Sequence, residues 1–192
     1  MIKSFKYDLF NLSDAELVNK YYFSGSAFAF EDEQLYRLRQ TVSDFFNIDY
    51  NQVFMVGSAK LGFSIKPSRR FKPFYDKSDV DLVIVCKTLF EEIWTDIFSF
   101  EKSGGYWPKM QQFKTYHFKG WIRPDMLPLE KTFTLTKKWW DFFENLSGSG
   151  EFGPYKVRGG LYHSRYFFDA YQTKCFEQCR IEGNDYENIS NQ

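Results

Sequence analysis

Two carboxylates separated by a single residue stand at the start of the most apolar run of the chain. Asp79 and Asp81 open the segment DVDLVIVC, whose alternation and β-branched residues predict a strand. Residues two apart on a strand point to the same side, so the two carboxylates should be neighbours. Like charges side by side repel, and a hard divalent cation with a preference for oxygen ligands relieves that repulsion. The spacing therefore predicts a site for Mg²⁺ or Mn²⁺ at Asp79 and Asp81.

A candidate phosphate site lies upstream, where Gly57 and Ser58 follow the short apolar run VFMV. We expect that run to be a strand and a helix to begin at Ala59. Backbone N–H groups at the start of a helix favour anions, glycine permits close approach, and the serine hydroxyl can donate a hydrogen bond. Lys60, in the first turn of the expected helix, is a further candidate for nucleotide binding.

The order of strand, Gly-Ser, helix and Asp-x-Asp strand resembles the polymerase β-type nucleotidyltransferase superfamily. The residues that carry the resemblance are Val56-Gly57-Ser58 and Asp79-Val80-Asp81-Leu82, and the segment that contains both covers about a fifth of the chain. The spacer between them is longer than is usual in the superfamily. The alternative is that both carboxylates are solvated residues at the start of an ordinary strand.

The resemblance implies an α/β fold of the polymerase β-like type, with a small mixed sheet flanked by N- and C-terminal helices. It also implies transfer of a nucleotide from an NTP or dNTP, ATP among them, to a hydroxyl acceptor with release of pyrophosphate. Asp79 and Asp81 would hold the metal, while Gly57 and Ser58 would bind the phosphates.

The superfamily usually places a third carboxylate on a strand beside the Asp-x-Asp strand. We expect that strand over residues 113–122, which contain no carboxylate. Asp125, just past its end, is the candidate for a third catalytic and metal-binding residue. Glu101 and Asp141 are poorer candidates because both fall in expected helices. The alternative for Asp125 is an ordinary turn residue after Pro124.

Two basic segments are candidates for phosphate binding. The long spacer carries Arg69 and Arg70 among aromatic residues, a combination that can bind a triphosphate or a single strand, although a solvated loop is an equal alternative. Arg158 opens Arg-Gly-Gly, which could direct backbone N–H groups at a phosphate, although a turn is the stronger alternative.

Helical spacing predicts the remaining elements. Ser13 and Glu16 form a capping-box pattern before a helix that should end near Gly25. Further helices are expected over 31–46, 88–104, 136–146 and 164–181. We expect one domain over 1–181 and a polar, flexible tail over 182–192.

Composition bounds the function classes. The chain has 192 residues, 21% aromatic residues and a formal net charge of zero, so attraction for nucleic acid must be local. Its three cysteines lack metal-ligand spacing, which fits reduced thiols. No apolar run is long enough for a membrane span, and the N-terminus lacks a signal-peptide core. A cytoplasmic location without membrane contact is the expectation.

Small stand-alone members of this superfamily occur in bacterial toxin–antitoxin and antiphage operons. More loosely, the chain resembles the nucleotidyltransferases of Hailong antiphage systems. That resemblance implies template-independent synthesis of short single-stranded oligonucleotides in antiviral defence, with an effector protein from the same operon as a possible partner. Transfer of AMP to a protein hydroxyl, or an inactive nucleotide-binding module, are the alternatives.

An acceptor hydroxyl within the chain is a further expectation. Tyr186 is the sole aromatic residue after Phe176, in a polar stretch that offers it no packing partner. A tethered hydroxyl has a high effective concentration. Tyr186 is therefore a candidate self-nucleotidylation site, with Ser190 as the weaker choice and an inert residue as the alternative.

Overall fold

The computed structural model describes the backbone of residues 1–129, 131 and 133–190, and side chains as far as Ile181. Its sheet consists of β1 (Val53–Val56), β2 (Val80–Val85), β3 (Trp121–Ile122) and β4 (Val157–Tyr162). Its α-helices are α1 (Ile2–Asn11), α2 (Asp14–Val18), α3 (Asp32–Phe46), α4 (Gly57–Leu61), α5 (Lys87–Lys102), α6 (Met110–Phe118), α7 (Thr134–Gly148) and α8 (Arg165–Ser190). Short turns of π- or 3₁₀-helix are η1 (Asn19–Phe23), η2 (Tyr50–Gln52), η3 (Pro67–Arg69) and η4 (Pro124–Met126).

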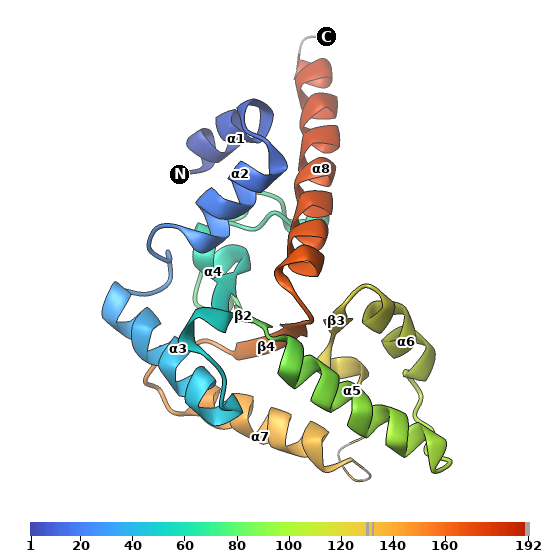
Figure 1. Cartoon of the computed structure of the whole chain (residues 1–192). Helices are drawn as coiled ribbons and strands as arrows, with labels where there is room; N and C mark the ends of the chain where they lie inside the picture. The colour runs from blue at the N-terminus through green and yellow to red at the C-terminus, as the bar shows by residue number, and fades with distance from the viewer. Residues whose placement is uncertain (130, 132, 191–192) are drawn as a thin grey trace.

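The strands form one mixed sheet in the order β1-β2-β4-β3. Strand β2 is antiparallel to β1 and parallel to β4, and β3 is antiparallel to β4. Helices flank this sheet on both sides (Figure 1). The expected class, α/β with a small mixed sheet between helices, is thus confirmed.

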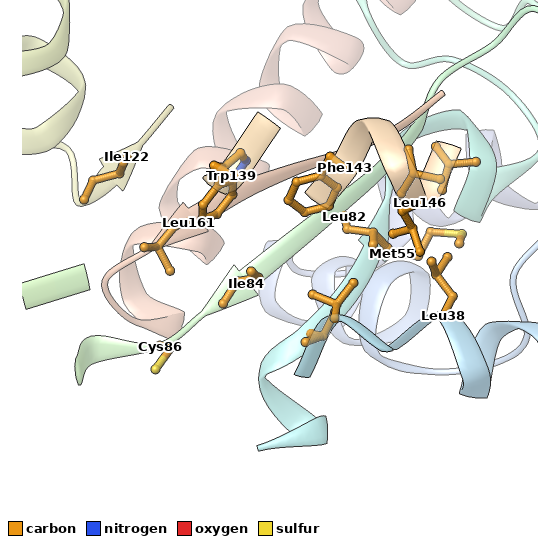
Figure 2. Close-up of a cluster of buried hydrophobic side chains, with 14 of the residues drawn as sticks. Leu38, Met55, Leu82, Ile84, Cys86, Ile122, Trp139, Phe143, Leu146 and Leu161 are labelled. Atoms are coloured by element: carbon orange, nitrogen blue, oxygen red, sulfur yellow. The ribbon is translucent and has the colours of Figure 1, made fainter. Parts of the chain in front are cut away.

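Alternating residues of β2 divide the apolar core into two clusters, because successive side chains on a strand point to opposite faces. Leu82 and Ile84 belong to the cluster that α3, α5 and α7 cover. Figure 2 shows this side, where Leu82 lies near Phe143 of α7. Val83 belongs to the second cluster, which α1, α2 and α8 cover. Asp81 lies two residues before Val83 on the same strand, so its side chain points to the same face of the sheet as Val83.

Local sequence signals position several helices as expected. Ser13 accepts from the backbone N–H of Glu16 and Glu16 returns the bond, which confirms the capping box of α2. Helices α3, α5 and α7 lie where apolar spacing predicts them. Helix α1 was not expected. Helix α8 runs to Ser190, past the expected end at Ile181. None of the helices, over the residues that the structure describes, is both long and apolar enough to cross a membrane.

The strand expected over 113–122 is wrong. Residues 110–118 form α6, and β3 has only two residues. Phe113, Tyr116 and His117 are spaced three and four apart, which places them on one side of a helix, and Phe113 is buried. Gly120, with a left-handed φ of 63°, makes the turn into β3.

The turn expected at Arg158-Gly159-Gly160 is also wrong, since these residues lie in β4. Gly159 is required by packing: a Cβ there would lie 2.3 Å from the Phe143 ring. A pair of glycines in sequence is typical of a turn, but here one of them leaves room for a ring from α7. Only the tertiary contact reveals this reason.

Lys60 is a structural residue and does not face the candidate site. It is buried, and its ammonium donates to the carbonyl oxygens of Ser24, Gly25 and Ser26 at 2.9, 2.7 and 3.1 Å. Burial lowers the pKa of the ammonium, and the charge of Arg39 lowers it further. Lys60 therefore holds the loop between η1 and α3, and this role takes the place of the expected one in nucleotide binding.

We expect Lys60→Met to destabilise the chain by about 2 kcal/mol, because charge-assisted hydrogen bonds to three carbonyl groups are lost. Urea unfolding measures this change. Lys138→Met, at an exposed position of α7, is the control and should shift stability by less than about 0.5 kcal/mol. A Lys60→Met variant of unchanged stability would contradict the structural role.

Candidate functional site

The two halves of the sequence motif meet at the pairing of β1 with β2. Val56, the last residue of β1, is the register partner of Asp81. Gly57 follows with a left-handed φ of 67°, and a Cβ at this position would lie 3.1 Å from Oδ2 of Asp81. Both the backbone conformation and the close approach favour glycine here. The Asp81 carboxylate therefore lies directly against the Gly57 backbone, where α4 begins.

Arg158 brings a cation to the carboxylate pair from the neighbouring strand. It is the parallel register partner of Asp81, and its Nε lies 3.2 Å from Oδ2 of Asp79. This places Arg158 in the site, as the sequence suggested, but on a strand. A metal ion that binds the Asp79 carboxylate would therefore have to compete with Arg158.

Among the residues that the structure describes, Asp81 has no ion-pair partner. Burial raises its pKa; the charges of Lys66 and Arg158 oppose that rise, and the charge of Asp79 adds to it. Over the part of the chain that the structure describes, its side chain forms no hydrogen bond or ion pair. A partly buried carboxylate with no proton donor is destabilised by desolvation. A bound cation would reverse this, so the residues fit a metal ion between Asp79 and Asp81.

Ser58 follows Gly57 in the first turn of α4. The side chain is partly buried, and among the described residues its hydroxyl makes no hydrogen bond. It is therefore available to a ligand. Of the four residues that the sequence groups into one site, the structure brings Gly57 against Asp81 and Asp79 close enough for its charge to act on Asp81.

The basic insert folds back on itself beside the site. Phe63 and Pro73 form a β-bridge. The Ser64 N–H donates to the Lys72 carbonyl oxygen at 2.9 Å, and the Ser64 carbonyl oxygen accepts from the Phe71 N–H at 2.7 Å. Arg69 is exposed and donates to the hydroxyl of Tyr75 at 2.8 Å. Arg70 is half-buried. Lys66 is the insert cation whose positive charge opposes the rise in the pKa of Asp81.

Asp125 does not join the pair. Pro124 ends β3 after two residues, and the η4 turn directs Asp125 toward Arg123 at 3.1 Å and Lys109 at 3.6 Å. Across the described residues, no cluster of three or more His, Cys, Asp or Glu could hold a metal. Asp125 is thus a turn residue with cationic partners. It does not supply the third carboxylate that we expected beside Asp79 and Asp81.

Two lysines that the sequence did not single out lie beside Asp79. A hollow there is lined by Asp76, Lys77, Ser78, Asp79, Pro154 and Lys156. The Lys156 carbonyl accepts from Val80 N–H at 2.8 Å, which joins the two loops. Lys77 could have been noticed from its position two residues before Asp79. Lys156 could not, because only the parallel pairing of β4 with β2 brings it here.

Tyr186, the predicted acceptor, lies on the C-terminal part of α8. Its side chain is outside the described residues, as is that of Ser190.

Comparison of the chain with protein-family models, with curated proteins and with solved structures gives no match. Any function must therefore be argued from the site itself.

Proposed function

We propose that this chain is a metal-dependent, template-independent nucleotidyltransferase of the polymerase β-like type. The observation that carries the proposal is the contact between Gly57 and Asp81, which unites the phosphate-type turn with the carboxylate pair. An ordinary strand edge with solvated acids would not need a positive-φ glycine pressed against a partly buried carboxylate. The mixed sheet and its flanking helices are compatible with this fold.

Asp79 and Asp81 would hold Mg²⁺ or Mn²⁺, as the uncompensated charge of Asp81 favours. Such an ion, when bound, neutralises phosphate charge and polarises the phosphorus under attack. The protein's own groups then position the triphosphate. The Ser58 hydroxyl can donate to a phosphate oxygen, and Lys66 and Arg158 supply positive charge on two sides of the carboxylates. Asp125 has no role in this proposal.

The acceptor is a hydroxyl group, and the proposed product is a short oligonucleotide made in the cytoplasm for antiphage defence. A protein hydroxyl that receives AMP is the other acceptor class, and Tyr186 is the candidate within the chain. An effector protein from the same operon would be the partner. Incubation with each labelled NTP and dNTP separates free oligonucleotide from labelled protein.

A catalytically inactive nucleotide-binding module is the second candidate. The ion pair between Arg158 and Asp79 favours it, because that arginine occupies the strand position beside Asp81 and partly satisfies the metal-binding carboxylates. The two candidates agree on nucleotide binding and differ in turnover. Nucleotide incorporation by the wild-type protein therefore separates them.

Asp79→Ala and Asp81→Ala should each lower nucleotide incorporation by more than about 100-fold, since each removes a proposed metal-binding group. The rate with radiolabelled nucleotide and Mg²⁺ measures this. Asp125→Asn is the matched control and should retain activity within about twofold, because it changes only surface ion pairs. Equal activity in wild type and both alanine variants would refute the mechanism, and nucleotide binding without incorporation in wild type would select the inactive module.

Asp81→Asn should raise the melting temperature at about pH 7.5 in EDTA, because it removes an uncompensated charge from a partly buried position. The sign follows from linkage: a carboxyl whose folded-state pKa is raised destabilises the fold as pH rises through the window above its ordinary value of 3.8. The gain should therefore shrink as pH falls toward 4. Mg²⁺ should stabilise wild type and not the variant.

Thermal unfolding over this pH range, with EDTA or Mg²⁺, provides the measurement. Asp125→Asn again serves as the control, because it should gain no stability at any pH. Identical melting curves for wild type and Asp81→Asn at about pH 7.5 would show that Asp81 is not destabilising, and that the reason given for a metal at this pair is wrong.

A further inference from the structure

The insert and helix α1 together form one cationic face beside the candidate site. Residues 62–74 carry four basic side chains and no acidic one. Helix α1 adds Lys3 and Lys6, and its sole acid, Asp8, is buried and paired with Lys20. The chain as a whole has a formal net charge of zero, so this is a local concentration of positive charge. The exposed cations of this face are Lys3, Lys6, Lys66, Arg69 and Lys72.

An aromatic contact joins α1 to the insert. The ring centroid of Phe5 lies 5.2 Å from that of Phe63 and 6.5 Å from that of Phe71. The Lys6 ammonium lies 4.5 Å from the centroid of the Phe71 ring. Buried rings thus fix α1 against the insert, while Lys6 remains exposed above the junction. This connection involves a helix that the sequence did not predict.

Exposed aromatic rings lie among these cations. Tyr75 is 46% exposed and Phe10 is 52% exposed. Arg69 holds Tyr75 through its hydroxyl at 2.8 Å and lies 5.6 Å from the ring centroid. Phe10 is four residues after Lys6 and so shares its side of α1. Within the described residues, neither ring packs against another aromatic ring, so both can accept a stacking partner.

We propose that this face, from Lys66 beside the carboxylates to Lys3 on α1, binds single-stranded nucleic acid. Phosphates meet the cations and unpaired bases stack on Tyr75 and Phe10, a combination that tolerates any base sequence. A free nucleotide is too small to use the face, because α1 alone is about 15 Å long. A duplex hides its base faces, so the exposed rings favour an unpaired strand.

The role of the bound nucleic acid rests on the proposed function: it would be the acceptor of the reaction, or the product that leads away from Asp81. Binding itself needs no turnover and is tested separately. DNA and RNA share the recognised chemistry, so both are used as probes.

The test measures fluorescence anisotropy of labelled oligothymidylate and oligouridylate of about twelve nucleotides, in EDTA and over a range of salt concentrations. Lys6→Ala and Lys72→Ala should each reduce the slope of log affinity against log salt by about 0.7. Tyr75→Ala should weaken binding by roughly fivefold or more with little change in slope. The matched control is Lys138→Ala on α7, across the sheet, which should bind as wild type does.

Three results would overturn the inference: no binding by wild type at low salt, an equal loss in Lys138→Ala, or unchanged affinity in Tyr75→Ala with anionic vesicles bound as tightly as the oligonucleotides. The last result would show recognition of charge alone.

The Asp81→Asn variant separates this inference from the proposed function, since it should bind the single strand normally and incorporate no nucleotide. Strand binding by a wild type that never incorporates nucleotide would remove the proposed function and leave this face in place.

Discussion

The pairing of β1 with β2, in the register that places Val56 opposite Asp81, is the constraint on which the candidate site depends. A slip of one residue would turn every side chain of β2 to the other face of the sheet. Asp81 would then point into the apolar cluster that α3, α5 and α7 cover, where a carboxylate is costly to bury. The apolar residues of β2 therefore fix the direction of Asp81, and Gly57 leaves room for it.

The charges around the pair come from elements far apart in the sequence. Arg158 on β4 compensates Asp79 directly, and Lys66 on the insert acts on Asp81 from a greater distance. Asp81 itself has no hydrogen-bonded partner within the described part of the chain. The site thus has one satisfied carboxylate and one that a cation would stabilise, which is the physical basis for proposing both metal binding and nucleotide binding.

The two apolar clusters support the site in different ways. The cluster under α3, α5 and α7 holds the sheet, and the Phe143 ring reaches β4 at Gly159. The other cluster joins α1, α8 and the insert through buried rings such as Phe5 and Phe176. Many of the aromatic residues are therefore core. Exposed rings such as Tyr75 are the ones available for recognition.

The sequence by itself determined β1, β2, the break at Gly57-Ser58, the capping box at Ser13 and most helices, because alternation, helical spacing and caps are written within a few neighbouring residues. It also predicted that Asp79 and Asp81 group with Gly57 and Ser58, and the structure brings Gly57 against Asp81. Only the tertiary structure decided that 158–160 form a strand, that Asp125 turns away from the pair, and that Lys60 serves a loop. These outcomes depend on long-range partners, namely the Phe143 ring, the Lys109 ammonium and the carbonyl groups of 24–26, which no local pattern encodes.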